Sequence, residues 1–174
     1  MGNLNQIIDF ARISGYRALT EELRLGGCRQ IPVSLPRSVR LPLMASFQQD
    51  LNVPILFLTS RPDRLQSMHE EFEFWSDTGS HLIFAEPAPL FYERAAWDLD
   101  TRKDRLQTLI ALAKAHLPYE KGTLSNAAIF TSVKSIMTRT APRRDFISAC
   151  SRLKDGSSVS MTNLARKLVG IGYT

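Results

Sequence analysis

The chain has few of the residues from which metal centres and disulfide frameworks are built. Its 174 residues include two cysteines, Cys28 and Cys150, and three scattered histidines. The cysteines form no CxxC pair and lie near no histidine cluster, so we expect unpaired thiols and no metal or redox site. No Ser/His/Asp or Cys/His arrangement is recognisable, and the sequence therefore predicts that this segment is not an enzyme and holds no cofactor.

Long apolar runs are also missing. The longest, such as 54–58 and 127–130, are far shorter than the roughly 20 residues that a membrane-spanning helix needs. The N-terminus has no basic segment followed by an apolar core, which a secretory signal would show. We therefore expect a cytoplasmic protein that does not associate with membranes.

The composition is that of a folded globular protein, with 44% hydrophobic and 22% charged residues. The net charge of +5 is compatible with a nucleic-acid or acidic-protein partner, but proteins with neither partner also carry such charges. The basic excess lies toward the C-terminus. It comprises Lys134, Arg139, Arg143, Arg144, Arg152, Lys154, Arg166 and Lys167.

Apolar periodicity predicts alternating strands and helices. Such alternation favours an α/β fold with a mainly parallel sheet and helices on both faces. We expect strands buried on both faces where the apolar runs are continuous. The expected strands are 30–35, 54–58, 81–84 and 127–131. The expected helices are one carrying Leu4, Ile7, Ile8 and Ala11, then 16–25, 39–51, one carrying Leu65, Met68, Phe72 and Trp75, 101–116, and a short one ending at Met137.

Two helices carry more detailed expectations. Pro42 should lie in the first turn of helix 39–51, where its missing N–H is harmless. Helix 101–116 should direct its large aliphatic side chains toward the core. These are Leu106, Leu109, Ile110 and Leu112.

We divide the chain into three parts. Residues 1–29 form an N-terminal helical appendage, and residues 30–145 form the α/β domain. Residues 146–174 form a small hairpin-helix element, in which Ser160 caps a final helix, 161–171. The last part looks like the beginning of a further subdomain.

The loop before helix 39–51 stands where a nucleotide-binding domain would carry GxxxxGK[ST]. Residues 34–41 read Ser-Leu-Pro-Arg-Ser-Val-Arg-Leu. If Arg40 replaces the phosphate-binding lysine, Leu41 replaces the metal-binding hydroxyl, and tight ATP binding is not expected. Arg37 and Arg40 either attract an anion at the helix N-terminus or are ordinary exposed arginines.

Other segments also have two interpretations. Thr59 and Ser60 follow a strand, at the position where parallel sheets bind ligands, and they either contact DNA or cap the next helix. The aromatic residues of segment 91–97 either form a partner surface or pack on their own domain. Asp98 and Asp100 precede Thr101, and we interpret them as turn and cap residues.

Five segments in order give the chain a resemblance to the N-terminal module of bacterial transcription-repair coupling factors (Mfd). The first resembles the degenerate Walker A region, the next three resemble strand–helix units, and the last resembles the entry to the UvrA-binding subdomain shared with UvrB. UvrB itself fits less well, because it keeps an intact P-loop and a long hairpin. The segments are 35–43, 54–75, 83–112, 128–146 and 153–173.

The resemblance covers about residues 30–174 and implies a P-loop or helicase-like fold of the UvrB domain 1a type. The full-length family couples removal of stalled RNA polymerase from double-stranded DNA to nucleotide excision repair by recruiting UvrA. ATP and Mg²⁺ act in its motor domains, outside this segment. The family's main UvrA-contacting strands are expected after Gly172-Tyr173, so UvrA binding is expected to need them.

The expected function is thus a non-catalytic repair-coupling module that contacts UvrA and other domains of its parent protein. The alternative is a nucleic-acid-stimulated ATPase or helicase domain of the UvrB type. A free-standing α/β domain with another ligand is the third possibility. The candidate residues are Arg37, Ser38 and Arg40 in the vestigial loop and Arg152, Lys154, Arg166 and Lys167 on a partner surface.

Overall fold

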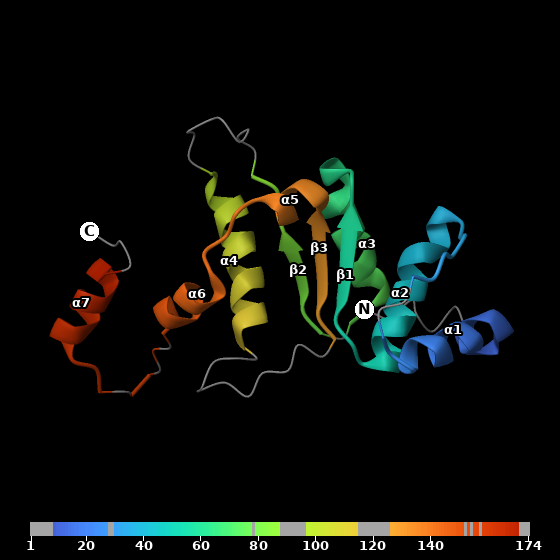
Figure 1. The fold of residues 1–174 in the computed structure, drawn as a ribbon, viewed down its shortest axis with the longest axis horizontal. Helices are drawn as coiled ribbons and strands as arrows, with labels where there is room; N and C mark the ends of the chain where they lie inside the picture. Colours follow the sequence, from blue (N-terminus) through green and yellow to red (C-terminus); the bar gives the residue numbers. More distant parts are fainter. Residues whose placement is uncertain are drawn as a thin grey trace. The chain divides into compact units, whose positions relative to one another are not determined.

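The computed structural model divides the chain into two compact units, Met1–Arg139 and Thr140–Thr174 (Figure 1). The first unit contains α1 and the helices and strands up to α5, and the second contains α6 and α7. The predicted boundaries at 29/30 and 145/146 differ from this division. The structure describes residues 9–27, 30–77, 79–87, 97–114, 126–151, 153, 155–156 and 158–170.

A small parallel sheet forms the centre of the first unit. Its strands are β1 (Ile55–Thr59), β2 (His81–Phe84) and β3 (Ala128–Ser132), in the order β1-β3-β2. Both neighbouring pairs are parallel, and Phe130 lies opposite Phe57 on one side and Ile83 on the other. The prediction of an α/β fold with a parallel sheet is confirmed.

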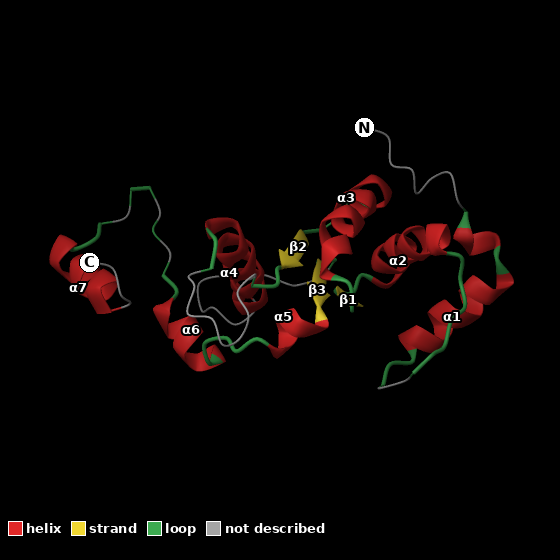
Figure 2. Cartoon of the chain, turned by 90° about the horizontal axis from the view of Figure 1, so that it is seen from above, coloured by secondary structure: helices red, strands yellow, loops and turns green. Residues whose placement is uncertain are grey.

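Helices α2 (Arg37–Leu51) and α3 (Leu65–Trp75) cover one face of this sheet (Figure 2). The ring of Phe57 stacks on that of Phe130 at 4.4 Å, and Phe72 meets both rings at their edges. Buried aromatic and aliphatic area of this kind is the main stabilising term of a small domain. The remaining core residues are Leu41, Ala45, Leu65 and Ala128.

The opposite face is less completely covered. All five residues of β3 are buried, as predicted for a central strand. On β1, however, Leu56 and Leu58 are each more than half exposed, so the prediction that this strand is buried on both faces is wrong. β1 is an edge strand, and among the described residues the predicted helical cover is complete only on the face bearing Phe57.

The predicted strand 30–35 is not present. These residues, like Pro36 after them, have no regular secondary structure, and most of their side chains are exposed. Pro32 within the segment has no N–H to donate to a neighbouring strand, which disfavours a central position in a sheet. The apolar run was therefore a misleading signal.

Helix α2 begins at Arg37, two residues before the predicted start. Pro42 consequently lies in the second turn of α2 and not in the first. Because proline has no N–H, it cannot donate to the carbonyl of Ser38 from this position. Helix α1 (Ser14–Arg24) packs against α2, because Tyr16 stacks on Phe47 at 5.1 Å between ring centroids. The predicted N-terminal appendage thus shares a hydrophobic cluster with the α/β domain.

Helix α4 (Leu99–Lys114) packs along β2 with a face that the sequence did not predict. Its buried residues include Thr101, Arg105 and Thr108. β2 is an edge strand, and Thr108 donates a 3.0 Å hydrogen bond to the carbonyl of Ile83. Polar side chains are favoured here because they satisfy backbone carbonyls that no further strand pairs. The predicted inward residues Leu106, Ile110 and Leu112 are exposed, and Leu109 is half-buried.

The C-terminal unit contains α6 (Arg143–Ala149) and α7 (Met161–Gly170), and none of its described residues is in a strand. The predicted hairpin from residue 146 is therefore wrong. Pro142 before α6 and Asp145 in its first turn are helix-start signals that outweigh the apolar run. The final helix is confirmed, with Ser160 Oγ accepting a 3.4 Å hydrogen bond from the N–H of Asn163.

None of the helices in the described part of the chain combines the length and apolar character needed to cross a membrane.

Candidate functional site

The carboxyl ends of the three strands lie at the same edge of the sheet, where open parallel sheets bind ligands. The polar residues at this edge are Thr59 at the end of β1, Glu86 shortly after β2, and Ser132 at the end of β3. The short helix α5 (Val133–Met137) starts directly after β3 and brings Lys134 to the same edge. This edge is the best candidate site in the described part of the molecule.

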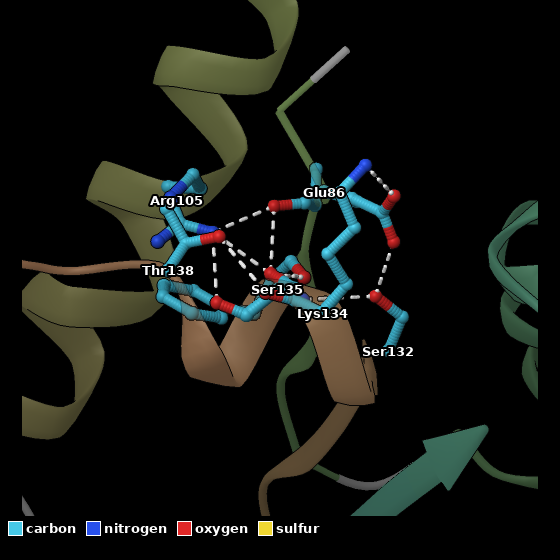
Figure 3. Close-up of polar contacts among 8 residues, drawn as sticks. Glu86, Arg105, Ser132, Lys134, Ser135 and Thr138 are labelled. Atoms are coloured by element: carbon cyan, nitrogen blue, oxygen red, sulfur yellow. Dashed lines mark hydrogen bonds and ion pairs between the residues drawn. The ribbon is translucent and has the colours of Figure 1, made fainter. Parts of the chain in front are cut away.

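Glu86 is the centre of one half of the site (Figure 3). Its Oε2 accepts a 2.7 Å hydrogen bond from the hydroxyl of Ser132, and its Oε1 lies 2.8 Å from Nζ of Lys134. Burial raises the pKa of the Glu86 carboxyl, but the hydrogen bonds from Lys134 and Ser132 together outweigh burial. The pKa therefore lies below its ordinary value, and Glu86 is ionised at neutral pH.

Ser135 connects β2 with α5. The hydroxyl of Ser132 caps α5 by accepting a 3.0 Å hydrogen bond from the N–H of Ser135. The hydroxyl of Ser135 shares its single proton between two acceptors, the carbonyl oxygens of Phe84 and Ala85, each 2.8 Å away. Ser135 is completely buried, and its hydroxyl thus joins the end of β2 to α5, the helix that follows β3.

Arg105 of α4 fills the other half of the site and is only 3% exposed. Its guanidinium lies 3.9 Å from the ring centroid of Phe84 and 5.0 Å from that of Trp97. Nη1 donates 2.8 Å hydrogen bonds to the carbonyl of Ala85 and the hydroxyl of Ser135. Nη2 is buried and has no hydrogen-bond partner among the residues that the structure describes. Burial lowers the pKa of Arg105, although an arginine stays charged at any physiological pH.

The end of β1 is more exposed. Thr59 Oγ1 accepts a 3.0 Å hydrogen bond from the N–H of Arg61, and the Arg61 guanidinium forms an exposed ion pair with Asp63 at 3.0 Å. These contacts form the turn before the 3-10 helix Pro62–Arg64 and α3, but neither helix has a side-chain cap, so the interpretation of Thr59 or Ser60 as a helix cap is wrong. A DNA-contacting role for Thr59 or Ser60 stays a prediction.

The vestigial loop residues do not form a phosphate-binding loop. Arg37, Ser38 and Arg40 all lie in the first turn of α2, and no strand precedes them among residues 30–36. The Nε of Arg40 donates a 3.3 Å hydrogen bond to the carbonyl of Leu35. A P-loop instead wraps glycine N–H groups around phosphate. These residues therefore do not fit Mg²⁺-ATP.

The predicted partner surface is described only in part. Arg152 and Lys154 lie outside the described residues. Arg166 and Lys167 lie on the exposed surface of α7, where Arg166 donates to Asn163 Oδ1 at 3.2 Å and Lys167 donates to the carbonyl of Cys150 at 3.4 Å. Within the described part of the chain, each cation thus uses only one of its N–H donors in these bonds.

Asp98 caps α4, because its Oδ1 accepts a 2.7 Å hydrogen bond from the N–H of Thr101, as predicted. Trp97 packs on Arg105, so this residue makes a contact within its own domain, as the second of its two interpretations predicted. The other aromatic residues of segment 91–97 lie outside the described residues. His69 and His81 lie beside the core ring of Phe72 or Phe130, and the described residues contain no group of three metal-ligating side chains.

Sequence reasoning missed the central residues of the site, Glu86, Ser132 and Ser135. Each one stands at or shortly after the end of an apolar strand run, and this was the signal available. Lys134 was noted only as part of the basic excess. No signal in the sequence indicated Arg105, because a lone arginine in a helix gives no indication of burial.

No protein-family model matches the chain, and no curated protein matches it.

Proposed function

We propose that the chain is a non-catalytic, UvrB-like module of a transcription-repair coupling factor and serves as a binding platform for UvrA and for other domains of its parent protein. RNA polymerase and double-stranded DNA are partners of the full-length protein in this proposal. The finer fold assignment, a helicase-like domain of the UvrB domain 1a type, is part of the same proposal.

The main support is that the carboxyl edge of the sheet is occupied by internal contacts. Glu86 bonds to Ser132 and to Lys134, and Ser135 bonds to the carbonyl of Ala85. Arg105 fills the space beside them and donates to the hydroxyl of Ser135. A site built to bind nucleotide would keep such donors free for phosphate. Here they join two strands and two helices, which suits a rigid scaffold.

The loop before α2 supports the same proposal. Residues Arg37 to Arg40 are already helical, and the Arg40 side chain turns back to its own chain at Leu35. A platform needs no nucleotide, and the loss of the glycines and of the P-loop lysine is neutral for it.

The C-terminal unit offers the partner surface. None of the described residues of α6 and α7 is buried, and α7 carries Arg166 and Lys167 on one side and aliphatic residues on the other. Such an amphipathic, unburied helix is typical of a segment that buries its apolar face against a partner.

Calorimetry with UvrA tests the proposal. Because the main UvrA-contacting strands are expected after Tyr173, the titration uses a form extended C-terminally by about 80 residues, a span set by typical domain size. This extended chain would be compared with its double variant, Arg166→Glu/Lys167→Glu, and with Arg12→Glu in the first unit as the matched control, since this arginine is also exposed. We expect the extended chain to bind, the double variant to weaken binding and the control to leave it unchanged. Equal affinities for the extended chain and both variants would place the interface elsewhere, and no binding by the extended chain at any accessible concentration would overturn UvrA as its direct partner.

An ATP titration separates the platform from the alternative ATPase. We expect no saturable binding of Mg²⁺-ATP. Micromolar affinity that is abolished by Arg40→Ala would overturn the non-catalytic proposal in favour of a UvrB-type ATPase.

A further inference from the structure

Helix α4 exposes most of its large aliphatic residues and buries several polar ones, although Leu109 is half-buried and Ala113 is buried. Leu99 is 75% exposed, Leu106 is 50% exposed and Ile110 is 41% exposed. The opposite side of the helix, which faces β2, carries the buried residues Thr101 and Thr108. A helix in a globular domain normally has the reverse arrangement.

These three residues form a single line along the helix, and Leu112, the fourth exposed aliphatic residue of α4, lies off this line. Their spacings of seven and four residues return to the same side of an α-helix, because 3.6 residues make one turn. We name Leu99, Leu106 and Ile110 the α4 stripe. Contiguous exposed apolar residues on one face mark an interaction site more often than scattered ones do.

The hydrogen bonds of α4 explain why the stripe faces outward. Arg105 donates to the carbonyl of Ala85, and Thr108 donates to that of Ile83, both at the edge of β2. Rotating the helix to bury the leucines would remove these bonds and leave the Ile83 carbonyl without the Thr108 hydroxyl, at roughly 1–3 kcal/mol for a buried group left unpaired. The orientation of α4 is therefore set by polar contacts, and the stripe is left for another binding partner.

The charges beside the stripe have one sign. Arg102, Lys103 and Lys114 are exposed and lie within about 70° of the line of the stripe around the helix axis. The two acidic residues of α4, Asp100 and Asp104, lie farther round the helix, and Asp104 is half-buried. Burial, with a contribution from Asp100, raises the pKa of Asp104 and so disfavours its negative charge. The surface is apolar along its centre and basic at its borders.

We propose that the α4 stripe is a docking surface for an amphipathic helix of a protein partner whose apolar line is bordered by Glu or Asp. The C-terminal unit of this chain does not match that chemistry, because its sequence contains six basic and two acidic residues. A nucleic acid matches the borders but not the centre, since leucines gain little against a sugar-phosphate backbone. The inference rests on α4 alone and holds whether or not UvrA is a partner of the chain.

Two designed peptides test the chemistry of the partner. Both are amphipathic helices with leucines at the spacing of the stripe, one bordered by Glu and the other by Lys. Binding of each fluorescently labelled peptide to the 174-residue chain would be measured by anisotropy. We expect the Glu-bordered peptide to bind at least roughly tenfold more tightly than the Lys-bordered one, a difference of about 1.4 kcal/mol.

Matched substitutions locate the site. Leu106→Asp should weaken the Glu-bordered peptide by roughly tenfold or more, because the change removes an apolar anchor and adds a repelling charge. Leu56→Asp is the control, since Leu56 is an equally exposed leucine on β1. Circular dichroism would check that both variants fold, and Ile110→Asp would replace Leu106→Asp if the latter does not.

Three results would overturn the proposal. The first is equal binding of the two peptides, and the second is an equal loss of affinity in the Leu106 and Leu56 variants. The third is displacement of the Glu-bordered peptide by a single-stranded oligonucleotide that binds the Leu106 variant as tightly as the wild type, which would indicate a site that recognises charge alone.

Discussion

Phe72 offers the most direct test of how the first unit is held together. Its side chain is fully buried, and its ring centroid lies 5.2 Å from that of Phe57, 5.4 Å from that of Phe130 and 5.2 Å from that of His81. Phe72→Ala would remove most of the ring from a cluster that α2, α3 and all three strands share. Truncations of this kind in a core cost about 3–5 kcal/mol in the free energy of unfolding.

The same helix provides the control. Phe74 lies two residues farther along α3 and is 55% exposed, so Phe74→Ala should change the free energy of unfolding by less than about 1 kcal/mol. Urea unfolding followed by far-ultraviolet circular dichroism measures both values, and an unchanged slope would show that the two variants unfold from comparable states.

The outcome that would refute this reasoning is a similar loss of stability in both variants. Such a result would mean that α3 is rotated relative to the sheet, because only rotation would bring Phe74 into the core. Since small domains are stable by only about 5–15 kcal/mol, Phe72→Ala could leave little folded protein. Phe72→Leu then takes its place, with a smaller expected loss that still exceeds that of Phe74→Leu.

Three further predictions concern single contacts. The pKa of the Glu86 carboxyl is lower in the folded protein than its ordinary value of 4.5, so its contribution to stability is present above pH 4.5 and is lost as the pH falls through the lower folded value. The free energy of unfolding in urea should therefore depend less on pH in this window for Glu86→Gln than for the wild type. Gly79 has a φ of +87°, and a Cβ there would overlap the carbonyl oxygen of Asn126, so Gly79→Ala should lower the melting temperature, whereas Gly15→Ala, with open space around it, should not. Tyr16→Phe removes the hydrogen bond from the tyrosine hydroxyl to the carboxylate of Asp50 near the end of α2. It should lower the free energy of unfolding, measured by chemical denaturation, by about 1 kcal/mol, and an unchanged value would show that this contact contributes nothing.

Apolar spacing correctly predicted the elements whose burial is simple. The helix predicted from the spacing of Leu65, Met68, Phe72 and Trp75 forms α3, and these four residues lie on one side of it. The continuous apolar run at 127–131 forms the central strand β3, buried on both faces. In both elements the local pattern and the tertiary contacts require the same residues to face inward, so the pattern was sufficient.

The candidate site could be predicted only in outline. Its location at the carboxyl edge follows from a parallel sheet, and the sequence predicted such a sheet. Its residues could not be predicted, because Glu86 and Ser132 lie 46 positions apart in the sequence and meet only when β2 pairs with β3. The vestigial loop could correspond to a P-loop only if a strand preceded α2, and residues 30–36 do not form one.

The sequence by itself determined the α/β class, the parallel strands and most helix positions, because the period of apolar residues is a local property that one segment expresses alone. Only the tertiary structure decided which side of each element is buried at the edges of the sheet. The leucines of α4 face outward because β2 is an edge strand whose carbonyls bond to Arg105 and Thr108. Leu56 and Leu58 are exposed because β1 is the other edge. Strand order sets both results, and strand order depends on contacts between segments that are distant in the sequence.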